Sequence, residues 1–178
     1  MIALVNYGLG NILAFVNIYK RLNVPVTVAD SSEALTRADK IILPGVGSFD
    51  WAMSRLDGSG MRACLDDLVL RQQRPVLGIC VGMQMMAKRS EEGKRAGLGW
   101  IEGEVRKFDE ATFAKQAHFP HMGWNDVVPM ENGSIFKGIT APRFYFLHSY
   151  HFAATNPEDV LAVTDYGGSF VSSIRVTL

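Results

Sequence analysis

Cys80 lies between two glycines in the stretch LGICVGMQMMAK, residues 77–88, where an apolar run gives way to a helical pattern. The run opens at Pro75 and is too short for a helix, so we expect a buried strand that ends near Ile79. The cysteine then falls at a turn from strand to helix. This G-x-C-x-G pattern predicts a nucleophile elbow, with cysteine in the position that serine takes in many hydrolases.

The residues after Cys80 predict a helix whose first turn faces the thiol. Apolar residues recur at helical spacing, and cations stand where a helix C-terminus favours them; these residues are Met83, Met86, Ala87, Lys88 and Arg89. The unpaired N–H groups at the start of such a helix would favour the thiolate. Gly78 and Gly82 have no Cβ, which suits a tight turn.

The second cysteine, Cys64, has no comparable setting in MRACLDDLVL. We expect it to pack in a helix as a small apolar side chain, which is the usual state of a free cysteine. Two cysteines at unrelated positions indicate neither a disulfide framework nor a metal site, so no metal is expected.

Two glycine-containing loops could supply backbone amides near the thiol. LPGVGSF, Leu43–Phe49, ends a strand and precedes a helical segment. Its N–H groups could form an oxyanion hole, although a plain turn between strand and helix has the same composition. YGLGN, Tyr7–Asn11, lacks the third glycine of a dinucleotide fingerprint and the lysine of a phosphate loop, so no cofactor is expected.

A cysteine nucleophile needs a base, and the chain has four histidines. We expect His121, in HFPHMGWND, to lie in a loop. His148 alternates with bulky residues in FYFLHSYHF, which is also typical of a satisfied histidine in a sheet. Neither has a carboxylate nearby in the sequence, so the sequence assigns the role of base to neither.

The composition favours a single domain over residues 1–178. Eighteen basic and eighteen acidic residues cancel, so no electrostatic surface for nucleic acid is expected. The N-terminal stretch lacks a basic leader, and no apolar run reaches the length of a membrane span. Together with the cysteine usage, these features predict a reducing cytoplasm.

The first half of the chain alternates between strand and helix. The strand patterns are IALVN, VPVTVA, KIILPG and PVLGI, and the helical patterns are GNILAFVNIYKRL and residues 51–56 and 59–72. Strands separated by helices predict a parallel sheet. Sites in such sheets form at the carboxyl ends of strands, where residues 7–11, residues 44–49 and Cys80 fall.

The second half has strand patterns without helices between them. These are GWIEGEVRKF, RFYFLHSYHFA, DVLAVTDY and GSFVSSIRV. We expect mixed or antiparallel strands that extend the first sheet and do not form a second domain.

Four motifs, LPGVGSF, GICVGMQ, PHMGWN and YFLHSY, resemble in order and spacing the glutaminase subunit of imidazole glycerol phosphate synthase. That family is a class I, triad-type glutamine amidotransferase. The resemblance runs from NYGLGN to SSI. It implies a flavodoxin-like α/β fold: a central, mostly parallel sheet with helices on both faces and a mixed or antiparallel C-terminal extension.

The resemblance also implies roles for nine residues. Cys80 would attack the glutamine amide, with the amides of Gly47 and Val81 as the oxyanion hole. The positions that hold glutamine would be Gln84, Ser149 and Tyr150. The face that meets a (β/α)₈-barrel synthase subunit, in a one-to-one heterodimer, would include Asn11, Trp124 and Tyr145. Ammonia would pass through the barrel, and no cofactor is implied.

One departure from the family pattern is the H-P-E motif, which supplies the base and its carboxylate and is absent from the 178 residues. The chain is expected either to stop before this motif or to have lost the triad, and to be catalytically impaired as given. Three alternatives stay open: a paralogous subunit for sugar amidination in surface polysaccharide synthesis, a non-catalytic docking subunit, and another cysteine hydrolase with His121 or His148 as base. The loop KQAHFPHMGWN does not separate the histidine pathway from the paralogue.

Overall fold

The computed structural model describes residues 1–109, 118–131 and 133–176. Four strands form a parallel sheet in the order β2-β1-β3-β4. They are β1 (Ile2–Val5), β2 (Val26–Ala29), β3 (Lys40–Gly45) and β4 (Val76–Cys80). The parallel sheet predicted for the first half is therefore confirmed. The strand order reverses between β1 and β3, which is where ligands bind in open α/β sheets.

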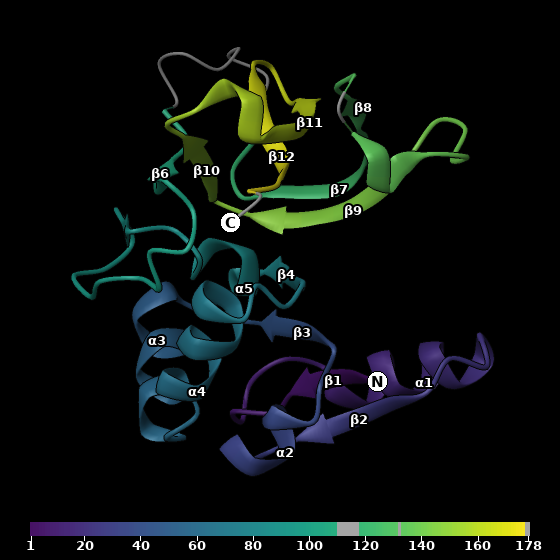
Figure 1. The fold of residues 1–178 in the computed structure, drawn as a ribbon. Helices are drawn as coiled ribbons and strands as arrows, with labels where there is room; N and C mark the ends of the chain where they lie inside the picture. Colours follow the sequence, from purple (N-terminus) through teal and green to yellow (C-terminus); the bar gives the residue numbers. More distant parts are fainter. Residues whose placement is uncertain (110–117, 132, 177–178) are drawn as a thin grey trace.

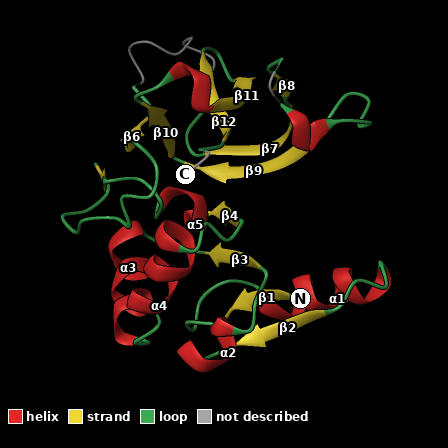
Figure 2. Cartoon of the chain, viewed as in Figure 1, coloured by secondary structure: helices red, strands yellow, loops and turns green. Residues whose placement is uncertain are grey.

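Helices connect these strands, and Figure 2 shows them gathered in the half of the molecule that holds the parallel sheet. They are α1 (Ile12–Arg21), α2 (Ser32–Thr36), α3 (Phe49–Gly58), α4 (Arg62–Asp66), the π-helical turn η1 (Asp67–Arg71) and α5 (Val81–Gln84). The sequence did not predict α2. Ser31 is the N-cap of this short helix, and its hydroxyl accepts the Ala34 N–H.

The helix after Cys80 is shorter than predicted, because α5 ends at Gln84. The carbonyls of residues 85–87 accept N–H groups from the segment 98–101 and do not continue a helix. Lys88 and Arg89 are thus not at a helix C-terminus, and that expectation was wrong. Arg89 instead begins the two-residue strand β5 (Arg89–Ser90) and forms an ion pair with Glu104.

The second half is rich in strands, as predicted, but they form sheets of their own (Figure 1). A six-stranded sheet has the order β5-β6-β10-β12-β11-β8, and β7 pairs with β9. Apart from β5, the strands are β6 (Gly103–Lys107), β7 (His121–Asp126), β8 (Val128–Pro129), β9 (Arg143–His148), β10 (Tyr150–Ala154), β11 (Val160–Asp165) and β12 (Ser169–Ile174). Two 3₁₀ turns are η2 (Ser134–Phe136) and η3 (Pro157–Asp159).

Two details of the second half differ from the sequence analysis. RFYFLHSYHFA is not one strand, because the chain leaves β9 at His148 and enters a different sheet at Tyr150. His121 does not lie in a loop but begins β7, where it pairs with His148 of β9. Within the described residues, β4 has one strand neighbour and does not pair with the second half.

One apolar core connects the two halves. It includes Ala3 of β1, Leu43 of β3 and Met53 of α3, and it continues to Val105 of β6 and Phe152 of β10. The single domain over residues 1–178 stays a prediction. A search of the described residues finds no helix that is both long and apolar enough to cross a membrane.

Candidate active site

Cys80 lies on a strained turn at the end of β4 and immediately before α5. Its φ and ψ are 57° and −121°, a backbone conformation that a residue with a side chain rarely adopts. A Cβ on Gly78 would lie 2.7 Å from Met83 Cα, and one on Gly82 would lie 1.9 Å from the Leu43 carbonyl oxygen. Both glycines are therefore required by close backbone packing, and the elbow exposes Cys80 at the surface.

The glycine loop after β3 lies directly beside this cysteine. The register of the sheet pairs Gly45 with Cys80, and a Cβ on Gly45 would lie 2.4 Å from the Gly82 nitrogen. Gly47 has φ +88°, which favours glycine. The backbone N–H of Val81, the next residue, lowers the pKa of the Cys80 thiol. The sulfur therefore has one of the two expected oxyanion-hole amides as its neighbour.

The loop after β1 contacts Pro44, at the start of the glycine loop. The Tyr7 hydroxyl donates a 2.7 Å hydrogen bond to the Pro44 carbonyl, and a Cβ on Gly10 would lie 2.9 Å from Pro44 Cβ. Burial and the neighbouring Cys80 raise the pKa of Tyr7. All three loops that were expected at the carboxyl end of the sheet thus meet around Pro44 and the thiol. The sequence pattern had placed Tyr7 in this loop but had indicated no role for its hydroxyl.

The electrostatics of the site favour the neutral thiol. Although Cys80 is exposed as a residue, the surrounding protein removes enough water from the sulfur to raise its pKa above the ordinary value. The Val81 N–H opposes this shift, and the carboxylate of Glu92 adds to it. The expected preference for the thiolate at the helix start is therefore outweighed.

Glu92 is a second residue that the sequence analysis missed. Its carboxylate accepts the Phe49 N–H at 2.8 Å, at the first residue of α3. Asp50 fixes the same segment, because its carboxylate accepts the N–H groups of Lys94 and Arg95, and these bonds lower its pKa. A charged link of the sequence thus becomes a fixed loop that holds a carboxylate near Cys80. No local pattern in the sequence indicates this approach.

Two of the residues expected to hold glutamine are brought together. Gln84 is buried, and its amide nitrogen donates to the Tyr150 carbonyl at 3.1 Å. Ser149 lies between β9 and β10, and its carbonyl accepts the Phe108 N–H. The substrate-binding roles of all three positions stay predictions.

No imidazole forms a hydrogen bond with Cys80 among the described residues. His148 instead bonds through Nδ1 to the Tyr150 carbonyl at 2.9 Å and through Nε2 to His121 Nδ1 at 3.1 Å. The interpretation of His148 as a satisfied histidine in a sheet is confirmed. The described part of the chain also contains no group of three His, Cys, Asp or Glu side chains that could hold a metal ion.

The residues expected at a partner interface are all exposed. Trp124 and Tyr145 are register partners on β7 and β9, and their rings meet edge to face with centroids 5.9 Å apart. Met122 and Leu147 lie on the same face of the ladder, and more than half of each side chain is exposed. Asn11 lies on another element, where its side chain caps α1 by accepting the Ala14 N–H.

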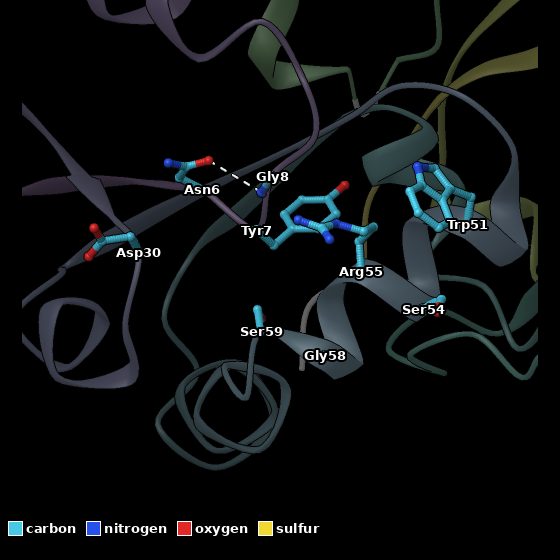
Figure 3. A pocket seen from close by; sticks show the side chains of 9 residues that line it. All are labelled: Asn6, Tyr7, Gly8, Asp30, Trp51, Ser54, Arg55, Gly58 and Ser59. Atoms are coloured by element: carbon cyan, nitrogen blue, oxygen red, sulfur yellow. Dashed lines mark hydrogen bonds between the residues drawn. The ribbon is translucent and has the colours of Figure 1, made fainter.

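A cavity of about 410 Å³ borders the loop after β1 (Figure 3). It is lined by Asn6, Tyr7, Gly8, Asp30, Trp51, Ser54, Arg55, Gly58 and Ser59. In Figure 3 the Arg55 side chain lies in front of the Tyr7 ring. Cys80 is not among the lining residues, so this cavity is not the thiol site.

Comparisons with known proteins agree on one family. Residues 3–177 match the family described as "Glutamine amidotransferase class-I". The chain is 54% identical over 175 residues to "Imidazole glycerol phosphate synthase subunit HisH" of Bdellovibrio bacteriovorus, covering 98% of this chain and 86% of the relative. It is 44% identical over 176 residues to the protein of the same description from Leptospira interrogans, with the same coverage. A solved structure described as "Crystal structure of glutamine amidotransferase" superposes with a TM-score of 0.69 at 17% identity, over 92% of this chain and 84% of that one.

Proposed function

Because the chain belongs to the class-I glutamine amidotransferase family, we propose that it is the glutaminase subunit of an imidazole glycerol phosphate synthase. The observation that carries the proposal is Cys80 on its strained elbow, with Gly45 of the glycine loop as its register partner and the Val81 N–H next to it in the chain. The names of the two relatives described above favour this subunit over other members of the family.

In the proposed reaction, the Cys80 thiolate attacks the side-chain amide carbon of glutamine. A C–S bond forms, and the amide N–H groups of Gly47 and Val81 stabilise the oxyanion. The C–N bond then breaks, and the leaving nitrogen takes up a proton to depart as ammonia. Water hydrolyses the glutamyl thioester, which releases glutamate and returns the thiol.

Glutamine carries an α-carboxylate and an α-ammonium group on its α-carbon, and the site contains a carboxylate that can attract the second of these. Gln84, Ser149 and Tyr150 are proposed to hold glutamine, as the family resemblance implies. We add Glu92 to this set, because a carboxylate held near the thiol complements the α-ammonium group of the substrate. Glu92→Gln should therefore raise the glutamine KM more than it lowers kcat.

The proposed partner is a (β/α)₈-barrel synthase subunit in a one-to-one heterodimer. Trp124 and Tyr145 offer an exposed aromatic pair, and aromatic side chains are frequent anchors of protein interfaces. Asn11 is proposed to border the same interface. A cytoplasmic location stays a prediction from the cysteine usage.

Modification by a diazo-ketone analogue of glutamine tests the proposed site, on the chain completed by a C-terminal segment that carries H-P-E. The thiol displaces N₂ from the analogue, so the modified residue identifies the group that faces the substrate carbon. We expect peptide mapping to find the label on Cys80, with glutamine protecting it, and none on Cys64, which is half-buried and donates to the Ser32 carbonyl. Label on Cys64 with Cys80 untouched would overturn the proposal.

A docking subunit without hydrolysis is a second candidate. It is favoured by the raised pKa of Cys80 and by the lack of a hydrogen-bonded imidazole among the described residues. Glutamate release by the chain with a barrel partner separates the two functions. Release that depends on Cys80 supports the glutaminase, whereas tight pairing without release, even after an H-P-E segment is appended, supports the docking subunit.

A further inference from the structure

One face of the β7–β9 ladder carries an exposed aromatic pair, and the other face carries hydrogen-bonded polar side chains. Alternation along the strands puts Trp124 and Tyr145 on the exposed face and the side chains of His121, Asn125 and His148 on the other. Those three side chains form an unbroken series of hydrogen bonds. Asn125 Nδ2 contacts His121 Nε2 at 3.4 Å, His121 Nδ1 contacts His148 Nε2 at 3.1 Å, and His148 Nδ1 contacts the Tyr150 carbonyl at 2.9 Å.

The proton positions in this series follow from its ends. A carbonyl only accepts, so His148 must carry a proton on Nδ1. At the other end, Asn125 Nδ2 donates to the Asp165 carbonyl at 2.7 Å and has one further hydrogen for His121 Nε2. His121 therefore also carries its proton on Nδ1 and donates it to His148 Nε2. The three hydrogen bonds from Asn125 to His121, from His121 to His148 and from His148 to the Tyr150 carbonyl therefore all run in the same direction.

The series needs both imidazoles to be neutral. Protonation of His148 at Nε2 would remove the acceptor for His121, and protonation of His121 at Nε2 would set two donors against each other. Burial and the neighbouring His148 lower the pKa of His121 to about 4. Burial and His151 lower the pKa of His148, which its bond to Tyr150 partly opposes. Among the described residues, Tyr166 also lies against the pair, and its ring stacks on His121 with the ring centroids 3.9 Å apart.

The series ends at the Tyr150 carbonyl oxygen, which also accepts a hydrogen bond from a residue of the proposed glutamine site. The Tyr150 carbonyl accepts from His148 Nδ1 and from Gln84 Nε2, so both of its lone pairs are used. Gln84 ends the helix that Cys80 begins. The position of this carbonyl therefore sets the position of the Gln84 amide relative to the thiol.

We propose that His121 and His148 are positioning residues for glutamine, which act by holding the Tyr150 carbonyl against the Gln84 amide. The proposal rests on the proposed function, since it assigns Gln84 and Tyr150 to the glutamine site. Neither histidine serves as the base for Cys80, because both rings are committed to this series.

Histidine NMR tests the geometry on the chain itself. Long-range ¹H–¹⁵N correlations of the imidazoles, assigned with His121→Asn and His148→Asn, report which ring nitrogen carries the proton. We expect His121 and His148 to be neutral at pH 7 with the proton on Nδ1, which is not the tautomer that free histidine prefers. A proton on Nε2 of either ring, or a charged ring, would overturn the proposal.

A matched pair of substitutions tests the positioning role. In His148→Asn the amide nitrogen takes the place of Nδ1, so the bond to Tyr150 can persist, whereas in His148→Gln it takes the place of Nε2 and that bond is lost. We expect His148→Gln to raise the half-saturation concentration for Cys80 labelling by the diazo-ketone about tenfold, the scale for one buried hydrogen bond. The maximal labelling rate should change little, and His148→Asn should stay within about threefold of the unaltered chain.

The controls keep this outcome separate from that of the proposed function. His118→Gln, at an exposed histidine, should leave labelling unchanged. Equal losses in both His148 variants would mean that the ring only fills space and would overturn the positioning role. All labelling is measured on the chain extended by a C-terminal segment that carries H-P-E, which supplies the base for the thiol. Absence of Cys80 labelling in that extended chain, with His148 unaltered, would overturn the proposed function, and the glutamine role of the pair with it, whatever tautomers the NMR reports.

Discussion

The hydroxyl of Tyr7 donates a buried 2.7 Å hydrogen bond to the carbonyl of Pro44. Pro44 is one residue before Gly45, which the sheet register pairs with Cys80. A residue near the start of the chain thus holds the strand end from which the proposed oxyanion loop departs. Loops that are far apart in the sequence therefore meet at Pro44, and we expect the Tyr7–Pro44 bond to affect the position of the glycine loop beside Cys80.

Tyr7→Phe is expected to weaken this support without removing the ring from the core. The Pro44 carbonyl would lose its buried donor, which costs about 1–3 kcal/mol of unfolding free energy. Labelling of Cys80 by the diazo-ketone should slow at saturating reagent, because the Gly45–Gly47 loop would be less well positioned. Tyr19→Phe is the matched control, since no hydrogen bond of the Tyr19 hydroxyl is found among the described residues. Equal effects of the two substitutions would contradict the prediction.

Trp124→Ala is expected to weaken pairing with the barrel subunit by about 2 kcal/mol or more, the scale of an interface anchor. The side chain is 64% exposed, so its removal should not open a cavity in the core. Titration calorimetry with the barrel subunit measures the loss, and Cys80 labelling should be retained. Trp51→Ala, at a half-exposed tryptophan on α3, should leave the affinity unchanged. An unchanged affinity for Trp124→Ala would exclude the interface role.

Stability should fall as pH drops below neutrality, and His121 should be a main cause. Its pKa is about 4 in the folded chain and about 6.5 when unfolded. The unfolded state therefore binds the proton first, so the stability from neutral His121 is present above about pH 6.5. It is lost as the pH falls from 6.5 toward 4, by about 3 kcal/mol at most. Urea unfolding at pH 7.5 and 5 measures this slope.

The pH dependence should flatten in His121→Asn, which keeps a donor at the Nδ1 position. The remaining slope comes from other groups, including His148 and His151, whose pKa values are lowered by burial. His118→Asn, at an exposed position, should keep the full slope. A slope in His121→Asn equal to that of the unaltered chain would contradict the assignment.

Appending a C-terminal segment that carries H-P-E is expected to raise glutamate release about 10²–10⁴-fold with the barrel subunit present, the usual worth of a general base. The 178 residues alone should release glutamate negligibly. Aggregation should also decrease, because β4 has one strand neighbour among the described residues and Leu77 is half exposed. The same segment with alanine in place of its histidine is the control, and it should reduce aggregation without restoring release.

A family-like rate from the 178 residues alone would contradict this expectation. It would mean that a histidine already present acts as the base, and it would also conflict with the commitment of His148 to Tyr150 and His121. The sequence of the loop KQAHFPHMGWN did not decide between the histidine pathway and the paralogue for sugar amidination. Its residues 115–117 lie outside the described residues.

Local patterns were sufficient for the elbow. The spacing of Gly78, Cys80 and Gly82 predicts a tight turn, because glycine has no Cβ. In the structure, a Cβ on Gly78 would meet the backbone of Met83, and one on Gly82 would meet the Leu43 carbonyl of the neighbouring strand. The four parallel strands were likewise visible as short apolar runs between helical patterns. In both cases the pattern is carried by residues that are close in the sequence, although the contact that requires Gly82 is with Leu43 of β3.

Tertiary structure decided what surrounds the thiol. The helix after Cys80 ends at Gln84 because the carbonyls of residues 85–87 bond to a loop more than ten residues away. Glu92 approaches Cys80 because the N-terminus of α3 holds its carboxylate. His121 lies in a strand and not in the expected loop, because it pairs with His148 of β9. Each outcome depends on a hydrogen bond between distant segments, whose partner exists only after the chain has folded, so no pattern of neighbouring residues encodes it.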